Sequence, residues 1–264
     1  MVAPETLAVC HAERVSPTSF GTPNYGAFAV AYARARPSYP DGLFAWLATL
    51  VPPRTAWDCG TGSGQAARGL ARHFERVIAT DVDHRQIASA APAENVEYRV
   101  APAERSGLPD HSVDLVSAAT AMHWFDLPAF SREVERVVRP GGVMAAWSYH
   151  GCIVGEPFTG LFDRFYRTTL RPHFPDAVEM VDGRYEDVRL PGEPLETPDL
   201  RLAGLWTKDR LLDFIESWSG VREYHELHGR HAVDTIREEL DDLWGDPSRP
   251  RELSWPLFVR ASRL

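Results

Sequence analysis

The sequence predicts an α/β protein built on a doubly wound, mostly parallel sheet of seven strands with an inserted helical cap. Three observations predict this class. Between residues 55 and 148, apolar strand-like runs alternate with helix-like runs, which is the signature of a parallel sheet with helices on both faces. A glycine-rich turn follows the first of these strands. Apolar and polar residues alternate near the C-terminus, as they do in a half-buried strand.

Six of the strands can be placed. They are expected at residues 55–59, 77–81, 96–100, 113–119, 143–148 and 253–260. Between the first two, Leu70 and Phe74 lie four residues apart on one face of a helix. A later helix, starting near residue 127, has Asp126 as its N-cap and Pro128 in its first turn. The run Pro140-Gly141-Gly142 is expected to end that helix before the fifth strand.

Four regions follow from this pattern. Residues 1–24 are expected to form a mobile N-terminal arm or lid, and residues 25–148 the core of the domain. Helix-like runs at 158–170, 207–218 and 234–244, with a proline-rich stretch at 191–198 among them, predict a helical cap over residues 149–252. Residues 253–264 are expected to return to the sheet as a strand, where Pro256 suggests an edge position or a bulge.

The composition narrows the class of partner. The chain has 264 residues with a formal net charge of -9, 44% hydrophobic and 25% charged residues, which is typical of a globular protein and argues against a nucleic-acid partner. Three cysteines in no metal-ligand spacing suit a reducing, cytoplasmic location. No signal peptide and no membrane-length apolar run is expected. His225, His228 and His231 are spread around a helix, so no metal site is expected.

The most informative run is the turn after the first strand. Acid Asp58 precedes it, and acid Asp81 ends the second strand. A carboxylate at that strand end can accept both hydroxyls of a ribose. Gln65 stands where a dinucleotide loop would have its third glycine, and Asp58 would repel a pyrophosphate but favour an ammonium group. The expected ligand is therefore a nucleoside joined to an amino acid, S-adenosylmethionine. Close backbone approach would come from Gly60, Gly62 and Gly64.

Residues 57–64 resemble the first motif of class I S-adenosylmethionine-dependent methyltransferases. Further stretches resemble one branch of that family, the small-molecule methyltransferases that include trans-aconitate and gliotoxin-type thiol enzymes. These stretches are Tyr32–Pro40, Ala103-Glu104, His123–Phe125, Arg139–Gly142 and Ser217–Ser219. The resemblance runs from about Tyr25 to near the C-terminus and is more specific for fold and cofactor than for the acceptor.

The resemblance implies roles around the cofactor. Asp58 and Gly60 would contact the methionine end, although Asp58 could instead cap the loop. Asp81 would bind the ribose, with Val82 beside the adenine and Asp83 capping the next helix. Ala103, through its backbone, and Glu104 would recognise the adenine, although Glu104 could be a solvated loop charge.

The N-terminal stretch would complete the cofactor site. Arg36 would pair with the methionine carboxylate, because a guanidinium matches two carboxylate oxygens. A surface arginine stacking on Tyr39 is the alternative. Tyr32, and more weakly Tyr25, would help to close the cofactor pocket.

On the acceptor side, His123 follows the fourth strand, where transfer occurs in this fold. It is the candidate catalytic residue, as a base or an orienting group, and a packed structural histidine is the alternative. Trp124 would line the acceptor pocket or plug the sheet edge. Trp206 and Trp218 are candidate pocket residues that could also simply pack the cap.

The expected function is methyl transfer to a small-molecule acceptor by direct displacement. A carboxylate or hydroxyl oxygen is favoured, and a thiol or an amine remains open. Two alternatives remain: a cofactor-binding protein without catalysis, and a methyltransferase acting on nucleic acid or protein. No membrane partner is expected, and the sequence leaves the oligomeric state open.

Overall fold

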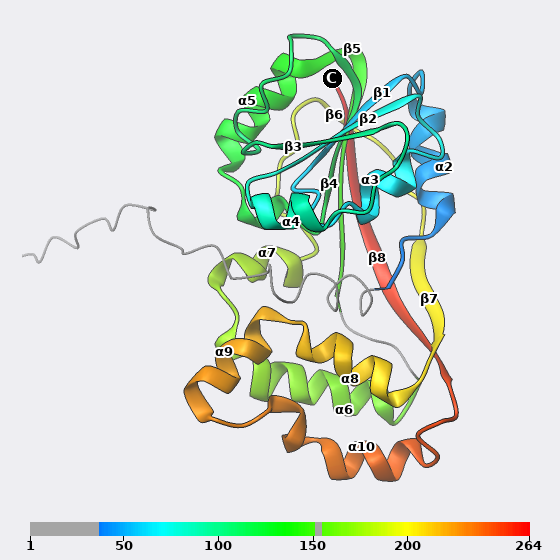
Figure 1. Ribbon diagram of the computed structural model, residues 1–264, viewed down its shortest axis with the longest axis vertical. Coiled ribbons are helices and arrows are strands. Elements are labelled where there is room, and N and C mark those ends of the chain that lie inside the picture. The colour runs from blue at the N-terminus through cyan, green and yellow to red at the C-terminus, as the bar shows by residue number, and fades with distance from the viewer. Residues whose placement is uncertain (1–36, 151–154) are drawn as a thin grey trace, which may run out of the picture.

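The computed structural model describes residues 37–150 and 155–264. Its strands are β1 Thr55–Cys59, β2 Arg76–Asp81, β3 Val96–Val100, β4 Val113–Ala119, β5 Val138–Tyr149, β6 Glu193–Pro194, β7 Leu200–Trp206 and β8 Arg251–Arg263. Within the described residues they form one open sheet of eight strands in the order β3-β2-β1-β4-β5-β8-β6, with β7 also pairing β8 (Figure 1). Strands β1 to β5 pair in parallel, and β8 is antiparallel to β5. The doubly wound, mostly parallel α/β fold is confirmed.

The helices of the described residues fall into a sheet-covering group and a cap group. The first group is α2 Asp41–Leu50, α3 Gln65–Leu70, α4 His84–Ser89 and α5 Leu127–Val137. The second is α6 Phe158–Phe165, α7 Glu179–Asp182, α8 Lys208–Glu216, α9 Ser219–His228 and α10 Arg237–Trp244. Single turns η1 Met122–Trp124, η2 Tyr166–Leu170, η3 Arg171–His173, η4 Asp176–Val178 and η5 Ala232–Thr235 connect them. The expected caps Asp83 and Asp126 each accept a backbone N–H at the start of α4 and α5.

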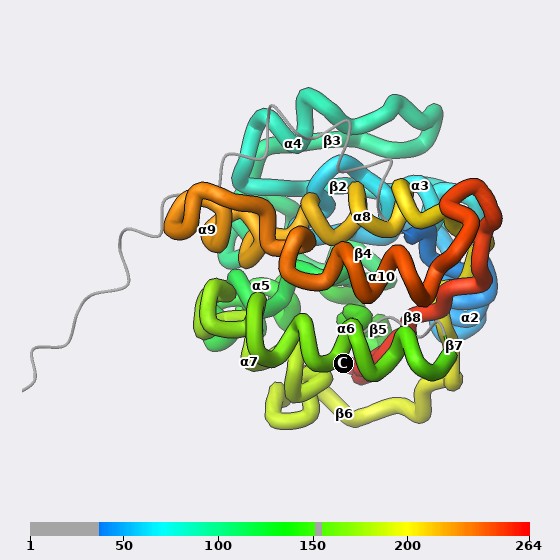
Figure 2. Tube along the Cα trace, turned by 90° about the horizontal axis from the view of Figure 1, so that it is seen from below, coloured from blue at the N-terminus to red at the C-terminus, as the bar shows by residue number. Residues whose placement is uncertain are grey.

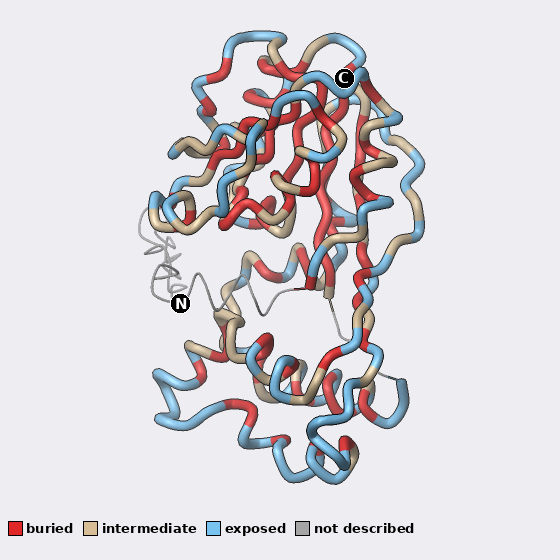
Figure 3. Tube along the Cα trace, turned by 45° about the vertical axis from the view of Figure 1, so that its right-hand side comes forward, coloured by how far each residue is buried: buried red, intermediate tan, exposed pale blue. Residues whose placement is uncertain are grey.

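Successive side chains of the strands belong to two apolar layers, one on each face of the sheet. In β1, Ala56 belongs to the layer that packs on α2 and α3, whereas Trp57 belongs to the layer that packs on α5. Period-two alternation explains this arrangement, because successive side chains of a strand point to opposite faces. Figure 3 shows the buried positions concentrated in the strands of the sheet. Helices therefore cover both faces of the parallel part of the sheet.

Of the cap group, α6 and α8 to α10 lie beyond the carboxyl ends of the parallel strands, and α7 lies between them and the sheet (Figure 1). Strands β7 and β8 run between the sheet and these helices (Figure 1). Figure 2 views the molecule from the cap side. Helices α6 and α10 pack on each other through an edge contact of Phe158 with Trp244. Buried side chains of the cap and of the α2–α3 layer form one continuous cluster, joined by residues such as Trp147 and Trp255. The cap thus shares its core with the sheet.

Several details differ from the sequence prediction. The expected seven strands are eight in the structure, because β6 and β7 lie in the segment expected to hold only cap helices and a proline-rich connection. Strand β5 begins at Val138, directly after α5, since Val138 already pairs with Val113 before a bulge. Helix α9 holds His225 and His228, whereas His231, expected on the same helix, lies beyond its end. Pro256 lies one residue beyond the last β8 residue paired with β5, so β7 alone pairs with the strand there.

In the part of the chain that the structure describes, no helix has the length and apolarity needed to cross a membrane.

Candidate active site

The glycine turn after β1 adopts a backbone that side chains disfavour. Gly60, Gly62 and Gly64 have φ angles of 66°, 56° and 79°, in the left-handed region where a residue with a Cβ is strained. A Cβ on Gly60 would lie 2.6 Å from the Ala121 Cβ, and one on Gly64 would collide with the Tyr98 ring. A Cβ on Gly62 would meet a neighbour only at 3.9 Å, so this glycine presents the open part of the turn to a ligand.

Asp81, at the carboxyl end of β2, holds this turn. One carboxylate oxygen accepts the N–H of Gly62 at 2.8 Å, and the other accepts the N–H of Asp83 at 2.9 Å. Burial raises the pKa of Asp81 above its ordinary value, and these backbone hydrogen bonds partly oppose the shift. Each carboxylate oxygen has a second lone pair, so Asp81 can bind the turn and still accept a ligand hydroxyl. Its ribose contact stays a prediction.

Asp58 is fully buried within the strand that leads into the turn. Its oxygens accept the hydroxyls of Thr61 at 2.5 Å and of Ser117 at 2.7 Å. Burial raises the pKa of Asp58 to about 6, and the hydroxyl donors work against that shift. The geometry favours the loop-holding interpretation, with the hydroxyls of Thr61 and Ser117 and the backbone of Ala67 as donors. The contact of Asp58 with a ligand amino group stays a prediction.

The surroundings of the turn fit S-adenosylmethionine. The nearby carboxyl group of Asp81 adds to the raised pKa of Asp58, so a ligand carrying ammonium and sulfonium charges would be attracted to this end of the sheet. Among the described residues, the Oε1 atom of Gln86 is buried without a hydrogen-bond partner, and it lies 3.9 Å from a Cβ built on Gly62. An orphaned acceptor beside the open glycine suits a ligand with hydroxyl or amino donors.

Two apolar side chains stand exposed at the ends of neighbouring strands. Val82, directly after β2, is 60% exposed, and Val100, at the end of β3, is 56% exposed. An aromatic base can cover such side chains and remove them from water. The adenine contact of Val82 stays a prediction, and Val100 is a second exposed strand-end valine that the sequence reasoning did not single out. A strand-end apolar residue on the strand next to the ribose acid was the available signal.

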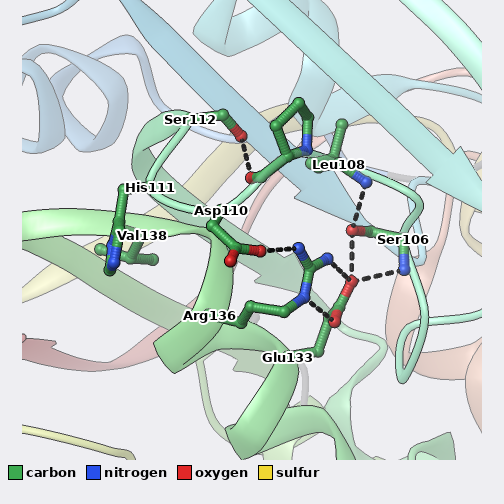
Figure 4. Close-up of polar contacts among 9 residues, drawn as sticks. Ser106, Leu108, Asp110, His111, Ser112, Glu133, Arg136 and Val138 are labelled. Carbon is green, nitrogen blue, oxygen red and sulfur yellow. Dashed lines mark hydrogen bonds and ion pairs between the residues drawn. The ribbon is translucent and has the colours of Figure 1, made fainter.

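The loop after β3 carries Ala103, which is buried, and Glu104. Glu104 accepts the backbone N–H of Asp126 at 2.9 Å, which ties this loop to the start of α5. Further along the loop, Ser106 donates its N–H and its hydroxyl to Glu133 of α5, as Figure 4 shows. The loop that is expected to recognise adenine is therefore fixed to α5 at two points. The adenine contacts of Ala103 and Glu104 stay predictions.

Glu133 owes its anchoring role to its partners. Burial by itself raises the pKa of Glu133, but hydrogen bonds from Arg136 and Ser106 outweigh burial and bring the pKa below its ordinary value. Arg136 also donates to Asp110 at 2.6 Å (Figure 4). A charge-assisted network of this kind rigidifies the loop from both sides.

A cavity of about 140 Å³ lies between the carboxyl ends of β4 and β5 and the cap. Half of its fourteen described lining residues are aromatic, namely Trp124, Tyr149, Tyr166, Phe174, Phe214, Trp218 and Trp255. The polar residues that line it are Thr120, His123, His150, Ser217 and Ser219. Because β1 and β4 are neighbours in the sheet, the cavity lies beside the glycine turn. An apolar cavity with a few polar groups is the usual form of a small-molecule site.

Thr120 marks the cavity end of β4 with a strained backbone. Its φ angle is 52°, which a β-branched residue rarely adopts. Its N–H donates to the Trp147 carbonyl at 2.7 Å, and its hydroxyl lies 3.2 Å from that of Tyr39. Strain of this kind persists where surrounding contacts enforce it, often at functional sites. The sequence reasoning missed Thr120.

His123 lies in η1 and lines the cavity while remaining 7% exposed. Its Nδ1 is 2.9 Å from the hydroxyl of Tyr185, whose ring stacks against the imidazole. Burial raises the pKa of Tyr185, so the phenol stays protonated and can donate to Nδ1. This contact fixes the imidazole. The structure places His123 at the cavity as expected, and its catalytic role stays a prediction.

The three candidate tryptophans differ in whether they line the cavity. Trp124, 46% exposed, and Trp218 both line the cavity. Trp206 is a correction, because it is absent from the lining and 2% exposed. Its ring packs on Trp255 at 4.7 Å and on Phe214 at 5.6 Å. As an inward residue of β7, Trp206 supports the two aromatic residues that do line the cavity.

Tyr25, Tyr32 and Arg36 lie outside the described residues, so their expected roles stay predictions. In the described ranges 37–150 and 155–264, no cluster of His, Cys, Asp and Glu side chains is suited to hold a metal ion.

The comparisons with known proteins agree with this geometry. The family model described as "Methyltransferase domain" matches residues 57–146, from β1 to β5. A protein of Dictyostelium discoideum named as a methyltransferase is 30% identical over 263 residues, covering 94% of this chain and 97% of the relative. An uncharacterised methyltransferase of Mycobacterium tuberculosis is 36% identical over 121 residues, which is 45% of this chain and 49% of the relative.

A solved structure agrees over most of the chain. A protein from Anaeromyxobacter dehalogenans, named as a type II methyltransferase, has a TM-score of 0.81 at 41% identity, covering 86% of this chain and 97% of that one. Fold, glycine turn and relatives thus define the class of protein. The chain belongs to the class I S-adenosylmethionine-dependent methyltransferases, and it is an enzyme of that family.

Proposed function

We propose that this enzyme transfers the methyl group of S-adenosylmethionine to an oxygen of a small-molecule acceptor held in the aromatic cavity. The resemblance to the small-molecule branch that includes trans-aconitate and gliotoxin-type methyltransferases supports the small acceptor, and the cavity supports it independently. We also propose that nucleic acids and membranes are not substrates, and that the enzyme works in the cytoplasm.

One observation carries the proposal. The glycine turn follows β1, the carboxylate of Asp81 ends β2, and the cavity is lined from the ends of β4 and β5. The strands are ordered β2-β1-β4-β5. A cofactor bound over the carboxyl ends of β1 and β2 would therefore lie next to Thr120 and His123, which follow β4. Ligands of open α/β sheets bind at the carboxyl ends of the strands. A methyl group directed toward β4 would therefore face the cavity.

The residues divide the work by position. Asp81, Gly62, Gln86 and the loop at Ala103 would hold the nucleoside, with Val82 against the base. Asp58, through the turn that it holds, and Arg36 would serve the amino-acid end. S-adenosylmethionine supplies an activated methyl group, so the protein mainly has to position the acceptor and exclude water. The aromatic lining, which includes Trp124 and Trp218, would exclude water.

The first experiment is calorimetric titration with S-adenosylmethionine, S-adenosylhomocysteine and NAD. Binding of the first two without NAD is expected. Binding of NAD alone would contradict the cofactor assignment. The second experiment incubates the enzyme and labelled S-adenosylmethionine with small carboxylic acids, alcohols, thiols and amines, and separately with RNA and protein mixtures.

Product masses then separate the alternatives. Label on small oxygen nucleophiles supports the proposal. Label only on thiols or amines contradicts the oxygen assignment, and label on RNA or protein contradicts the small-molecule assignment. Cofactor binding without transfer to any acceptor would support a binding protein instead.

A further inference from the structure

The cavity lining is aromatic and carries no counter-charge. Seven of its fourteen described residues are Trp, Tyr or Phe, and none of the fourteen is Lys, Arg, Asp or Glu. A carboxylate acceptor buried here would have no cation among these residues, and burying an unpaired charge is costly. A flat, neutral ring would stack on the aromatic walls at no such cost. The lining therefore favours a neutral aromatic acceptor.

A histidine paired with an acid stands at the end of β5. His150 lines the cavity, and its Nδ1 lies 3.4 Å from Oδ1 of Asp182 in α7. Two donors hold that carboxylate in place, since Tyr166 donates to Oδ1 at 2.7 Å and Arg171 donates to Oδ2 at 2.8 Å. The Tyr166 ring also packs edge-on against the imidazole at 4.6 Å. The pair leaves Nε2 as the imidazole nitrogen that can serve a ligand.

The charges around His150 suit a proton acceptor. Burial lowers the pKa of His150 below its ordinary 6.5, Asp182 and Asp163 oppose that shift, and Arg184 and Arg167 reinforce it. His150 is therefore neutral at neutral pH. Once it accepts a proton, the anchored Asp182 faces the new positive charge.

Resting on the proposed function, we infer that the acceptor is a phenol whose hydroxyl proton passes to His150, with Asp182 as the residue that positions the imidazole. The phenol oxygen forms a bond to the methyl carbon as the carbon–sulfur bond breaks, and that electron pair stays on the sulfur of S-adenosylhomocysteine. The proton remains on His150 until it is released to water. A phenol needs this help, because the phenol of tyrosine ionises only near pH ~10. His123 becomes an orienting residue of the cavity.

The test compares two phenols that differ in acidity. At mildly alkaline pH, 4-nitrophenol is largely ionised and needs no base, whereas 4-methylphenol is protonated and does. Wild-type enzyme is expected to methylate both, because the charge of 4-nitrophenolate is spread over its ring and nitro group and costs less to bury than the charge of a carboxylate. His150→Gln should lower the rate on 4-methylphenol by ~10²–10⁴-fold, the usual contribution of a general base, while the rate on 4-nitrophenol changes only a few-fold. His225→Gln, at an exposed histidine of α9 outside the cavity lining, is the matched control and should change neither rate.

Asp182→Asn tests the positioning role. Without the acid, the imidazolium is less stable, so the limb of the pH–rate profile on 4-methylphenol should move to lower pH. A purely structural loss would lower the rate at every pH and leave the limb in place. This variant and the wild-type profile also decide the matter if His150→Gln is shown by circular dichroism to be unfolded.

Three results would overturn the inference. The first is equal loss on both phenols in His150→Gln. The second is a pH limb that Asp182→Asn does not move. The third is transfer to benzoate with none to either phenol, which would leave the proposed function intact. Absence of S-adenosylhomocysteine binding by calorimetry would instead contradict the proposed function itself.

Discussion

Asp81→Asn is the sharpest perturbation of the proposed cofactor site. The wild-type carboxylate accepts the N–H groups of Gly62 and Asp83 on separate oxygens. An asparagine keeps the shape of the side chain but replaces one oxygen with an NH₂ group, which faces a backbone N–H as donor to donor. One of the two backbone groups therefore loses its acceptor. A ribose hydroxyl on that side loses its acceptor as well.

The magnitude follows from these contacts. Removing a hydrogen bond to a charged group costs about 1–3 kcal/mol. At about 1.4 kcal/mol for each tenfold change, the dissociation constant for S-adenosylmethionine should rise roughly 5- to 150-fold. Asp81→Ala removes both oxygens and should fall at the upper end of this range.

Calorimetric titration of wild type and variants with S-adenosylhomocysteine measures the effect directly. Asp83→Ala is the matched control. It removes the N-cap of α4 and should cost about 1 kcal/mol of unfolding free energy, while leaving cofactor affinity within a few-fold of wild type. A folded Asp81→Asn enzyme with unchanged affinity would refute the ribose assignment.

Three further changes test other parts of the site. The pKa of Asp58 rises from 3.8 to about 6 on folding, so its contribution to stability is full below pH 3.8 and is lost as pH rises through about 6. The loss in the free energy of unfolding should be about 1–3 kcal/mol. Urea unfolding measured across this pH range should show that loss in the wild type and not in Asp58→Asn. Gly64→Ala should lower the melting temperature and weaken cofactor binding, because the new Cβ meets Tyr98. The left-handed backbone alone should cost about 1–2 kcal/mol of unfolding free energy. An unchanged melting temperature would contradict the turn geometry. His123→Ala should lower kcat more than it lowers cofactor affinity. The loss in kcat should be smaller than the ~10²-fold that removal of a general base causes, and the limb of the pH–rate profile should remain. Loss of that limb in the variant would make His123 the base.

Much of the sheet could be predicted because its signals are local. The strands at 55–59, 96–100 and 113–119 have the predicted bounds. The first and third are buried parallel strands, which are short apolar runs between turn residues. Strand β3 lies at the edge of the sheet and has apolar residues at alternate positions. The caps Asp83 and Asp126 were also predictable, because a capping side chain acts within three residues of its own position. The glycine turn was predictable for the same reason, because its glycines lie close together in the sequence.

Strand β7 could not be predicted in the same way. Its inward residues Leu202 and Trp206 are separated by Gly204, and proline-rich sequence precedes it. Its identity as a strand depends on pairing with β8, about fifty residues later in the chain. The two-residue strand β6 likewise exists only through its pairing with Ser262 and Arg263. Long-range pairing leaves little trace in a local pattern.

The cavity shows the same limit at the level of side chains. Its polar residues come from segments as distant as Thr120, His150 and Ser219. The one sequence signal for His150 was its place just after β5, and it was hidden because that strand was expected to end at Ser148. Asp182 had no local signal at all, because its neighbours in space are Tyr166 and Arg171, on the turns between α6 and α7.

Acceptor choice and fold stability are coupled in this enzyme. Tyr149, Phe214 and Trp255 line the cavity and also belong to the continuous buried cluster that joins the cap to the sheet. Trp206 packs behind Phe214 and Trp255, so a change in either ring is transmitted to β7. Reshaping these walls for another acceptor would therefore cost packing energy throughout the cap. His150, Ser217 and Ser219 line the cavity with polar side chains, so replacing them would remove less apolar packing than replacing the aromatic walls.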